Sequence, residues 1–412
     1  MNSRERILAA GRGEPVDHTP MTTWCFGLRA PDHLKWQTDG QDVDYWFTNR
    51  LEHLHTLPHP WTLDDEFKRA LAWKSLGIDD VLEVSVPWSM DPAVTFTDSV
   101  LEPGDPAGDP HYPVMVREYV TPSGPIRHAV KKTDPEGPGW PMQPDCVPII
   151  EDYNIPRAVQ QPITAREHIA AVGHLFAPPG DAEKQWFRDR LAAMVPFAEK
   201  EGFPIQAWSG FGMDAAVWFC GTEGAIMLAM EDPTAFGEMM DMIARADTAR
   251  TQLAADTPGV DIICQRGWYS STDFWSPRLF DEFVFPHLQR LTKIAHDAGK
   301  LFGYVMTTGV EILGPRLADA GVDYLYFLDP VQDGLALETA RDLLSDRMTL
   351  VGGTNALTLN GSPDQIRKEV ADAMDVLAGT NRLILHPIDA VFPDTPWEGI
   401  ECMIDAWKQA IK

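Results

Sequence analysis

The sequence predicts an α/β fold: a (β/α)8 TIM barrel with an elaborated N-terminal half and an inserted β-hairpin. Short apolar runs rich in β-branched and aromatic residues recur in its last third and alternate with stretches of helical spacing. Polar residues follow these runs, as they do at the mouth of a parallel barrel, where active sites form. The runs are 260–264, 300–306, 322–328, 348–353 and 383–386.

The upstream elements are expected to complete that barrel. Strands are predicted over 21–26, 80–86 and 204–210, and helices over 4–12, 42–57, 67–77, 164–176, 181–201 and 233–253. Prolines and glycines are dense over 90–148, where 114–120 and 126–130 flank the turn residues 121–125. We therefore expect one domain over 1–412, with an insertion at about 90–150.

Composition narrows the class of protein. The chain has 34 basic and 61 acidic side chains, and this excess of negative charge disfavours nucleic acid as a partner. No apolar run reaches membrane-spanning length, and the first residues lead into an amphipathic helix and not a signal peptide. The five cysteines have no pair spacing, which is typical of reduced thiols in the cytoplasm.

Three residues near predicted strand ends are the catalytic candidates. Asp389 follows the last run and is either a general acid or a helix cap. His386, at the end of the same run, is an acid, a base, a ligand or a satisfied core residue. Tyr269 lies in an aromatic segment after the run 260–264.

A second set of residues is expected to bind substrate. Arg29 and Arg266 are either carboxylate anchors, because a guanidinium binds a carboxylate bidentately, or members of structural ion pairs. Aromatic side chains at a barrel mouth suit a flat or cationic ligand. The remaining candidates in this set are Trp24, Trp218, Trp268, Asn355, Met306 and Thr308.

Several segments together resemble the uroporphyrinogen decarboxylase superfamily, which includes corrinoid-linked methyltransferases. The opening helix and the Thr-Pro-x-Gly turn are similar to the methyltransferase branch, and the resemblance implies a (β/α)8 barrel. The segments that carry it are 4–10 with 13–17, 121–124, 276–280, 320–323, 352–355 and 392–396.

The functional positions of the decarboxylases are largely replaced. Of their strand-one arginines, the first falls on Cys25 and the second on Arg29. Their pyrrole-binding aspartate falls at 85–87, where there is no acid, their tyrosine falls near Trp218, and their late histidine falls on Asp389. The resemblance therefore argues against a porphyrinogen substrate.

The zinc set of the thiol-directed methyltransferases is also replaced. Met306, Thr308 and Asp389 occupy the positions of its histidine and cysteines, and thioether, hydroxyl and carboxylate form a poor zinc site. Histidines at 53 and 55 point away from each other on the predicted helix 42–57, so no other metal site is expected there.

Three functions stay open at this point. The first is a corrinoid-linked methyltransferase or demethylase acting on a small methylated donor, for which a methoxyaromatic compound is one candidate. Its corrinoid would be bound by a separate protein, since no Asp-x-His-x-x-Gly motif occurs. The second is a cofactor-independent decarboxylase of a small carboxylic acid, and the third is a non-catalytic ligand-binding barrel. A homodimer is one further expectation, through the inserted hairpin.

Overall fold

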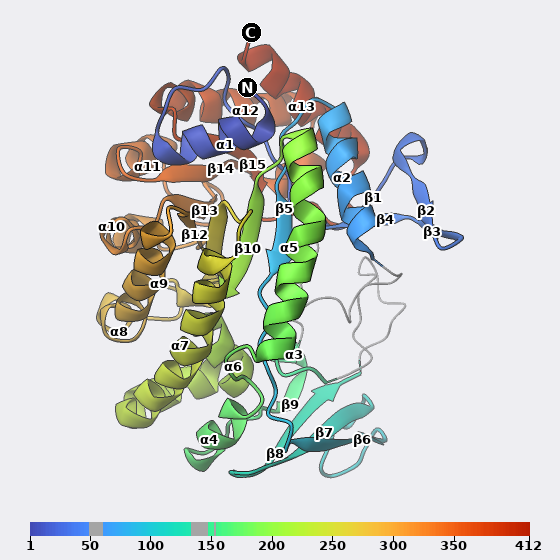
Figure 1. The fold of residues 1–412 in the computed structure, drawn as a ribbon, viewed down its shortest axis with the longest axis vertical. Coiled ribbons are helices and arrows are strands. Elements are labelled where there is room, and N and C mark those ends of the chain that lie inside the picture. Colours follow the sequence, from blue (N-terminus) through green and yellow to red (C-terminus); the bar gives the residue numbers. More distant parts are fainter. Residues whose placement is uncertain (49–60, 133–146, 152–153) are drawn as a thin grey trace.

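A computed structural model describes residues 1–48, 61–132, 147–151 and 154–412. Its centre is a sheet of seven parallel strands that curls into most of a barrel (Figure 1). In spatial order the strands are β15 (Leu383–Ile388), β14 (Thr349–Asn355), β13 (Tyr324–Leu328), β12 (Leu301–Val305), β11 (Ile262–Gln265), β10 (Ile205–Gly210) and β5 (Leu82–Ser85). Because all seven are parallel, their carboxyl ends share one edge.

The expected eighth strand is replaced by an irregular segment. Pro20 accepts a hydrogen bond from the backbone N–H of Leu385, and Thr22 donates one to the Leu385 carbonyl. On its other side, the Met21 carbonyl accepts from the N–H of Asp79, ahead of β5. The segment thus joins β15 to the β5 side without forming a regular strand. Pro20 contributes to this, because proline cannot donate to a strand ladder.

Two N-terminal predictions were wrong. β1 (Phe26–Arg29) begins where the strand predicted at 21–26 ends, and it pairs antiparallel with β4 (Tyr45–Phe47). β4 and β3 (Gln41–Val43) occupy the start of the helix predicted over 42–57, because the aromatic run Tyr45–Phe47 favours a pleated, half-buried surface. The rest of that helix, with His53 and His55, falls outside the described residues.

Helices cover the outside of the sheet (Figure 1). Those after the central strands are α6 (Met213–Glu231), α7 (Pro233–Asp256), α8 (Pro277–Phe283), α9 (Phe285–Asp297), α10 (Val310–Ala320), α11 (Leu337–Leu344), α12 (Pro363–Leu377) and α13 (Trp397–Ala410). Upstream are α1 (Ser3–Arg12), α2 (Leu63–Ser75), α3 (Asn154–Arg157), α4 (Glu167–Gly173) and α5 (Asp181–Glu201). α6 was not predicted, and it is kinked at Gly221, which has φ 72°.

A second sheet lies at the end of the molecule opposite α1 and α13 (Figure 1). It is antiparallel, in the order β6 (Thr95–Leu101), β7 (Val114–Thr121), β8 (Gly124–Lys131) and β9 (Ala158–Gln160). β7 and β8 are joined by the two-residue turn Pro122–Ser123, and α4 packs on β8. This sheet follows β5 in the chain and precedes β10.

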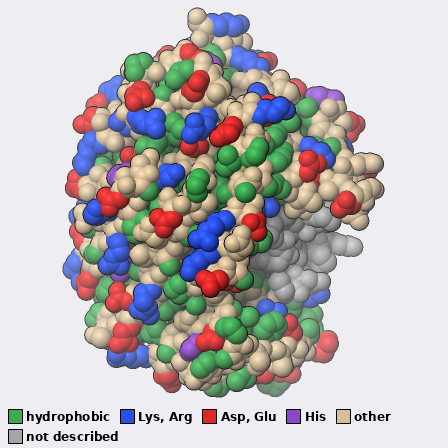
Figure 2. Space-filling view, viewed as in Figure 1, with side chains coloured by type: hydrophobic (Ala, Val, Ile, Leu, Met, Phe, Trp, Pro, Cys, Tyr) green, Lys and Arg blue, Asp and Glu red, His purple; other side chains and the backbone are tan. Residues whose placement is uncertain are grey.

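The surface carries charges of both signs. Figure 2 shows acidic and basic side chains interspersed over the face in view, with no continuous field of one sign. Over the described ranges, the structure contains no helix that is both long enough and apolar enough to span a bilayer.

Candidate functional site

The site is built around Arg266, at the carboxyl edge of the barrel sheet. Arg266 follows β11, and its guanidinium carbon lies 4.9 Å from the ring centroid of Trp218 and 4.6 Å from that of Trp268. It is only 2% exposed. A guanidinium that stacks on indole rings gains cation–π attraction, and the stacking fixes its plane.

Asp214 holds both Arg266 and the segment that follows it. Its Oδ2 accepts a hydrogen bond from Arg266 Nε at 3.1 Å, and its Oδ1 accepts from the backbone N–H of Tyr269 at 3.0 Å. Asp214 is fully buried in the first turn of α6, where a carboxylate is also favoured by the helix dipole. The carboxylate therefore positions Arg266 and the aromatic segment together.

The aromatic surface continues from Trp268 to the last strand. Trp24 stacks on Trp268 with ring centroids 6.1 Å apart, and it lies 6.3 Å from Phe327. Phe327 in turn stacks on His386 at 5.0 Å. We call these residues, with Arg266 and Trp218, the aromatic cluster. The structure thus brings together Arg266, Trp218, Trp268, Trp24 and His386 from the residues predicted to bind substrate or act in catalysis.

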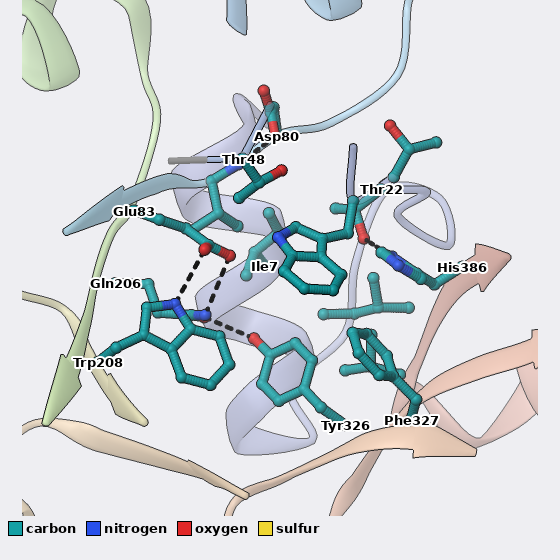
Figure 3. Close-up of a pocket in the computed structure, with 15 residues that line it drawn as sticks. Ile7, Thr22, Thr48, Asp80, Glu83, Gln206, Trp208, Tyr326, Phe327 and His386 are labelled. Carbon is teal, nitrogen blue, oxygen red and sulfur yellow. Dashed lines mark hydrogen bonds between the residues drawn. The ribbon is translucent and has the colours of Figure 1, made fainter. Parts of the chain in front are cut away.

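His386 is buried and neutral. Its Nδ1 lies 2.9 Å from the hydroxyl of Thr22, a contact that closes the barrel between β15 and the irregular segment (Figure 3). Burial lowers the pKa of His386 from 6.5 to about 3, and the backbone of Asp389 offsets this only in part. At neutral pH the imidazole can therefore donate or accept a hydrogen bond, but it carries no positive charge.

Next to the aromatic cluster lies a small, partly open cavity of about 30 Å³, which has room for one or two water molecules. Trp24, Phe327 and His386 line it, so it is continuous with the cluster. Its other lining residues come from several strands and from the segments that precede them, and they include the polar residues Asp80, Glu83, Gln206 and Tyr326. A ligand larger than two water molecules therefore does not fit into this cavity in the present conformation.

Glu83 is a site residue that the sequence analysis missed. Its carboxylate accepts from Trp208 Nε1 at 2.9 Å and from Gln206 Nε2 at 3.4 Å, and Tyr326 donates its hydroxyl to Gln206 Oε1 at 2.7 Å (Figure 3). Glu83 and Gln206 are register partners on β5 and β10, so their side chains leave the same face. A lone acid inside the apolar run 81–86 was the available signal.

Four predicted substrate-binding residues lie outside the aromatic cluster. Arg29 is exposed and donates to the hydroxyl of Tyr45 at 2.8 Å. The amide of Asn355 donates to Asp329 and caps the next turn by accepting from Leu357 N–H. The Thr308 hydroxyl donates a hydrogen bond to Asp273 at 2.6 Å. Met306 is fully buried and does not line the cavity.

The other two catalytic candidates flank the cluster. Asp389 is half-buried just past β15, and the N–H of nearby Val391 donates to the Trp24 carbonyl. Tyr269 is partly buried, and its carbonyl accepts from Trp275 Nε1 at 2.6 Å. Both are close in sequence to the cluster, and their catalytic roles stay predictions.

The donor set at the family's zinc positions does not fit zinc. Met306 offers a thioether, and the Thr308 hydroxyl already donates to Asp273, so only Asp389 could supply an anionic ligand. In the part of the chain that the structure describes, no three histidine, cysteine or acidic side chains are grouped to hold a metal ion.

Comparison with known proteins agrees with this fold. The model of the uroporphyrinogen decarboxylase (URO-D) family matches residues 198–410, just over half of the chain. The chain therefore belongs to the URO-D family, and its fold has a full-length likeness to a solved structure. That likeness is to a methyltransferase from Methanosarcina mazei, with 18% identity, 99% of both chains covered and a TM-score of 0.57.

Other solved structures align with lower TM-scores. A 3-keto-D-glucoside 4-epimerase from E. coli is 13% identical over 61% of this chain and 95% of its own, with a TM-score of 0.33. An endo-glycoceramidase II from Rhodococcus sp. is 12% identical over 54% of this chain and 65% of its own, with a TM-score of 0.31. These similarities carry no functional argument, and no curated protein sequence matches the chain.

Proposed function

We propose that the protein is a methyltransferase that removes a methyl group from a small donor, with a methoxyaromatic carboxylate as the leading candidate. Membership of the URO-D family and a full-length likeness to a methyltransferase support the reaction class. The observation that carries the donor class is the contact of the Arg266 guanidinium with the rings of both Trp218 and Trp268.

The aromatic cluster suits a flat, anionic donor. The partly buried ring of Trp268, which stacks on Trp24, offers an apolar surface for an aromatic ring. Arg266 is held in plane by the two indoles and Asp214, so little conformational entropy is lost when it binds a carboxylate. Because the adjacent cavity is small, the donor occupies the mouth beside it.

Removal of a methyl group from an ether leaves an oxygen that must be stabilised as it gains charge. Neutral His386 can supply a hydrogen bond through an imidazole N–H but cannot act as an imidazolium acid near neutral pH. Asp389, half-buried at the end of β15, is the proton donor that this proposal favours. The carboxyl group of Glu83 places oxygen acceptors at the floor of the site, which favours binding of the anionic end of a donor at Arg266 instead.

The methyl acceptor in this proposal is a corrinoid carried by a separate protein. A reduced corrinoid supplies a strong cobalt nucleophile for the methyl carbon. This chain contributes the remaining functions: it binds the donor, orients its methyl group toward the mouth and stabilises the leaving oxygen.

The proposal is tested by anaerobic incubation of the protein with cob(I)alamin and separate donors: methoxybenzoates, methoxybenzenes without a carboxylate, methylamines and methyl thioethers. Loss of the cob(I)alamin absorbance, together with mass-spectrometric detection of the demethylated donor, is the expected result for methoxybenzoates. Arg266→Ala should lower kcat/KM for them about 100-fold or more, the cost of losing a buried charged contact. Arg29→Ala, which removes an exposed guanidinium outside the cluster, is the matched control and should change it less than about threefold.

Decarboxylation of a small carboxylic acid is the second candidate. It is favoured by the donor set at Met306, Thr308 and Asp389, which lacks the zinc ligands of the thiol-directed methyltransferases. Release of CO2 from an aromatic acid, abolished in Arg266→Ala and independent of corrinoid, would support this function over methyl transfer. Donor binding without either reaction would instead indicate a ligand-binding barrel.

A further inference from the structure

A chain of three side chains connects the β7–β8 turn to α4, away from the aromatic cluster. The hydroxyl of Ser123 lies 2.9 Å from His174 Nε2, and His174 Nδ1 lies 2.8 Å from Asp91 Oδ2. Ser123 belongs to the Thr-Pro-Ser-Gly turn that the sequence analysis singled out and that methyl transfer does not use. These residues come from three separate segments of the chain.

The backbone holds each member of this chain in place. The Thr121 hydroxyl donates to the Gly124 carbonyl across the turn and accepts from the Ser123 N–H at 3.1 Å. His174 follows α4, and its carbonyl accepts from the Asp91 N–H at 2.8 Å, so the two residues are joined by backbone as well as side chain. The geometry therefore depends little on the movement of long side chains.

The direction of each hydrogen bond in this chain follows from the charge of Asp91. The Ala93 N–H and His174 hold the pKa of Asp91 below its usual value, so Asp91 is an acceptor at neutral pH. A neutral His174 must then carry its proton on Nδ1, which leaves Nε2 as the acceptor for the Ser123 hydroxyl. This is the arrangement in which a histidine removes a proton from a serine.

Ser123 and His174 line an open groove of about 850 Å³ between the turn, α4 and α7. Apolar side chains such as Ile169, Phe176 and Met242 form part of its wall. Its charged residues have mixed signs, and Arg166 is already paired with Glu238. Among the described residues Arg245 lines the groove without an ion pair.

We propose that Ser123, His174 and Asp91 form a second site that hydrolyses small, uncharged carboxylic esters by way of an acyl-serine. Apolar walls and mixed charges suit an uncharged acyl group better than an anionic one. The site is independent of the methyl-transfer proposal, because none of its residues lines the barrel cavity.

The reaction balances without an oxidant or metal. Ser123 Oγ bonds to the ester carbonyl carbon, and its proton passes to His174 Nε2. The bond from that carbon to the alkoxide oxygen then breaks, and His174 returns the proton to the departing alcohol. Water, deprotonated by the same nitrogen, attacks the acyl carbon; the acid leaves and Ser123 regains its proton. Ester and water thus become acid and alcohol.

The test uses a fluorophosphonate probe and p-nitrophenyl acetate with the full chain. The expected result is covalent labelling at Ser123, mapped by peptide mass spectrometry, and ester turnover that Ser123→Ala abolishes. His174→Gln should slow labelling about 100-fold, the usual contribution of a general base. Ser75→Ala changes an exposed serine that donates to its own helix, and it should leave both rates unchanged. Unlabelled Ser123, or equal labelling rates in wild type and His174→Gln, would overturn the proposal.

A second measurement does not depend on the native serine. In Ser123→Cys, His174 should draw the proton from the thiol and accelerate alkylation by iodoacetamide. Adding His174→Gln should slow that alkylation at least about 10-fold while circular dichroism stays unchanged. If the thiol is alkylated at the same rate with and without His174→Gln, the proposal is wrong, and the chain of hydrogen bonds serves only to attach the turn to α4.

Discussion

Replacing Arg69 by methionine should destabilise the barrel wall beside the site. Arg69 Nη2 lies 2.6 Å from Glu66 Oε1, and its Nη1 lies 2.7 Å from Asp80 Oδ2, with all three side chains at most 5% exposed. The substitution keeps an apolar stem but leaves two buried carboxylates. Arg190, which also interacts with the charge of Glu66, compensates only in part. We expect a loss of about 3–5 kcal/mol in the free energy of unfolding, as for other broken buried ion pairs.

The loss should depend on pH. Burial raises the pKa of Asp80 from 3.8 to about 7, although the charge of Arg69 acts in the opposite direction. Folded Asp80 therefore retains a proton that the unfolded chain releases, and its contribution to stability falls as the pH rises from about 4 to about 7. Without Arg69 the pKa of Asp80 rises further, so its contribution to stability continues to decrease above pH 7. The cost of Arg69→Met should thus be larger at about pH 8.5 than at about pH 5.5.

Urea unfolding followed by tryptophan fluorescence at both pH values measures this cost. The control is Arg166→Met, which breaks a pair with Glu238 in which both side chains are 50% exposed. That change should cost less than about 1 kcal/mol. A loss below about 1 kcal/mol for Arg69→Met at both pH values, or one that is equal at the two, would refute the reasoning.

Three further predictions address the barrel, the acid sensitivity of the second sheet and the site. Gly352→Ala should cost more than about 3 kcal/mol, because a Cβ there would lie 2.3 Å from the Leu328 carbonyl oxygen; Gly379→Ala, with open space, is the control in thermal melts. Burial lowers the pKa of His128 from 6.5 to about 3, so stability is lost as the pH falls below 6.5, by about 2 kcal/mol at pH 5. His128→Leu should remove this share of the loss in urea-unfolding stability and leave the similar share that His386 contributes, and an unchanged slope would contradict this. Arg266→Lys should raise KM for carboxylated donors about 10-fold without affecting uncharged ones, since lysine cannot replace the stacked fork.

Local patterns were sufficient for most of the barrel. The helix predicted over 181–201 coincides with α5, which ends at Gly202 in the left-handed conformation. The run 260–264 became β11 with a shift of at most two residues. Such elements are recognisable because buried parallel strands form continuous apolar runs and helices keep a 3.6-residue period.

The N-terminal closure of the barrel could not be read in this way. The segment around Met21 resembles a strand by composition, yet it makes two hydrogen bonds with Leu385 and one with Asp79 and forms no regular ladder. Leu385 lies far away in sequence, and Asp79 lies on the other side of the segment. Whether it forms a ladder depends on the space that the other seven strands leave, which no local pattern records.

The candidate site shows the same division between local pattern and tertiary contact. Order along the chain was enough to place Arg266, Trp218 and Trp268 near strand ends, because the carboxyl ends of parallel strands meet at one edge. Only the tertiary structure decided that the indoles contact the guanidinium, that Arg29 lies apart from it, and that Glu83 faces the cavity. Periodicity identifies which residues face inward, but the curl and register of the strands determine which inward-facing side chains come into contact.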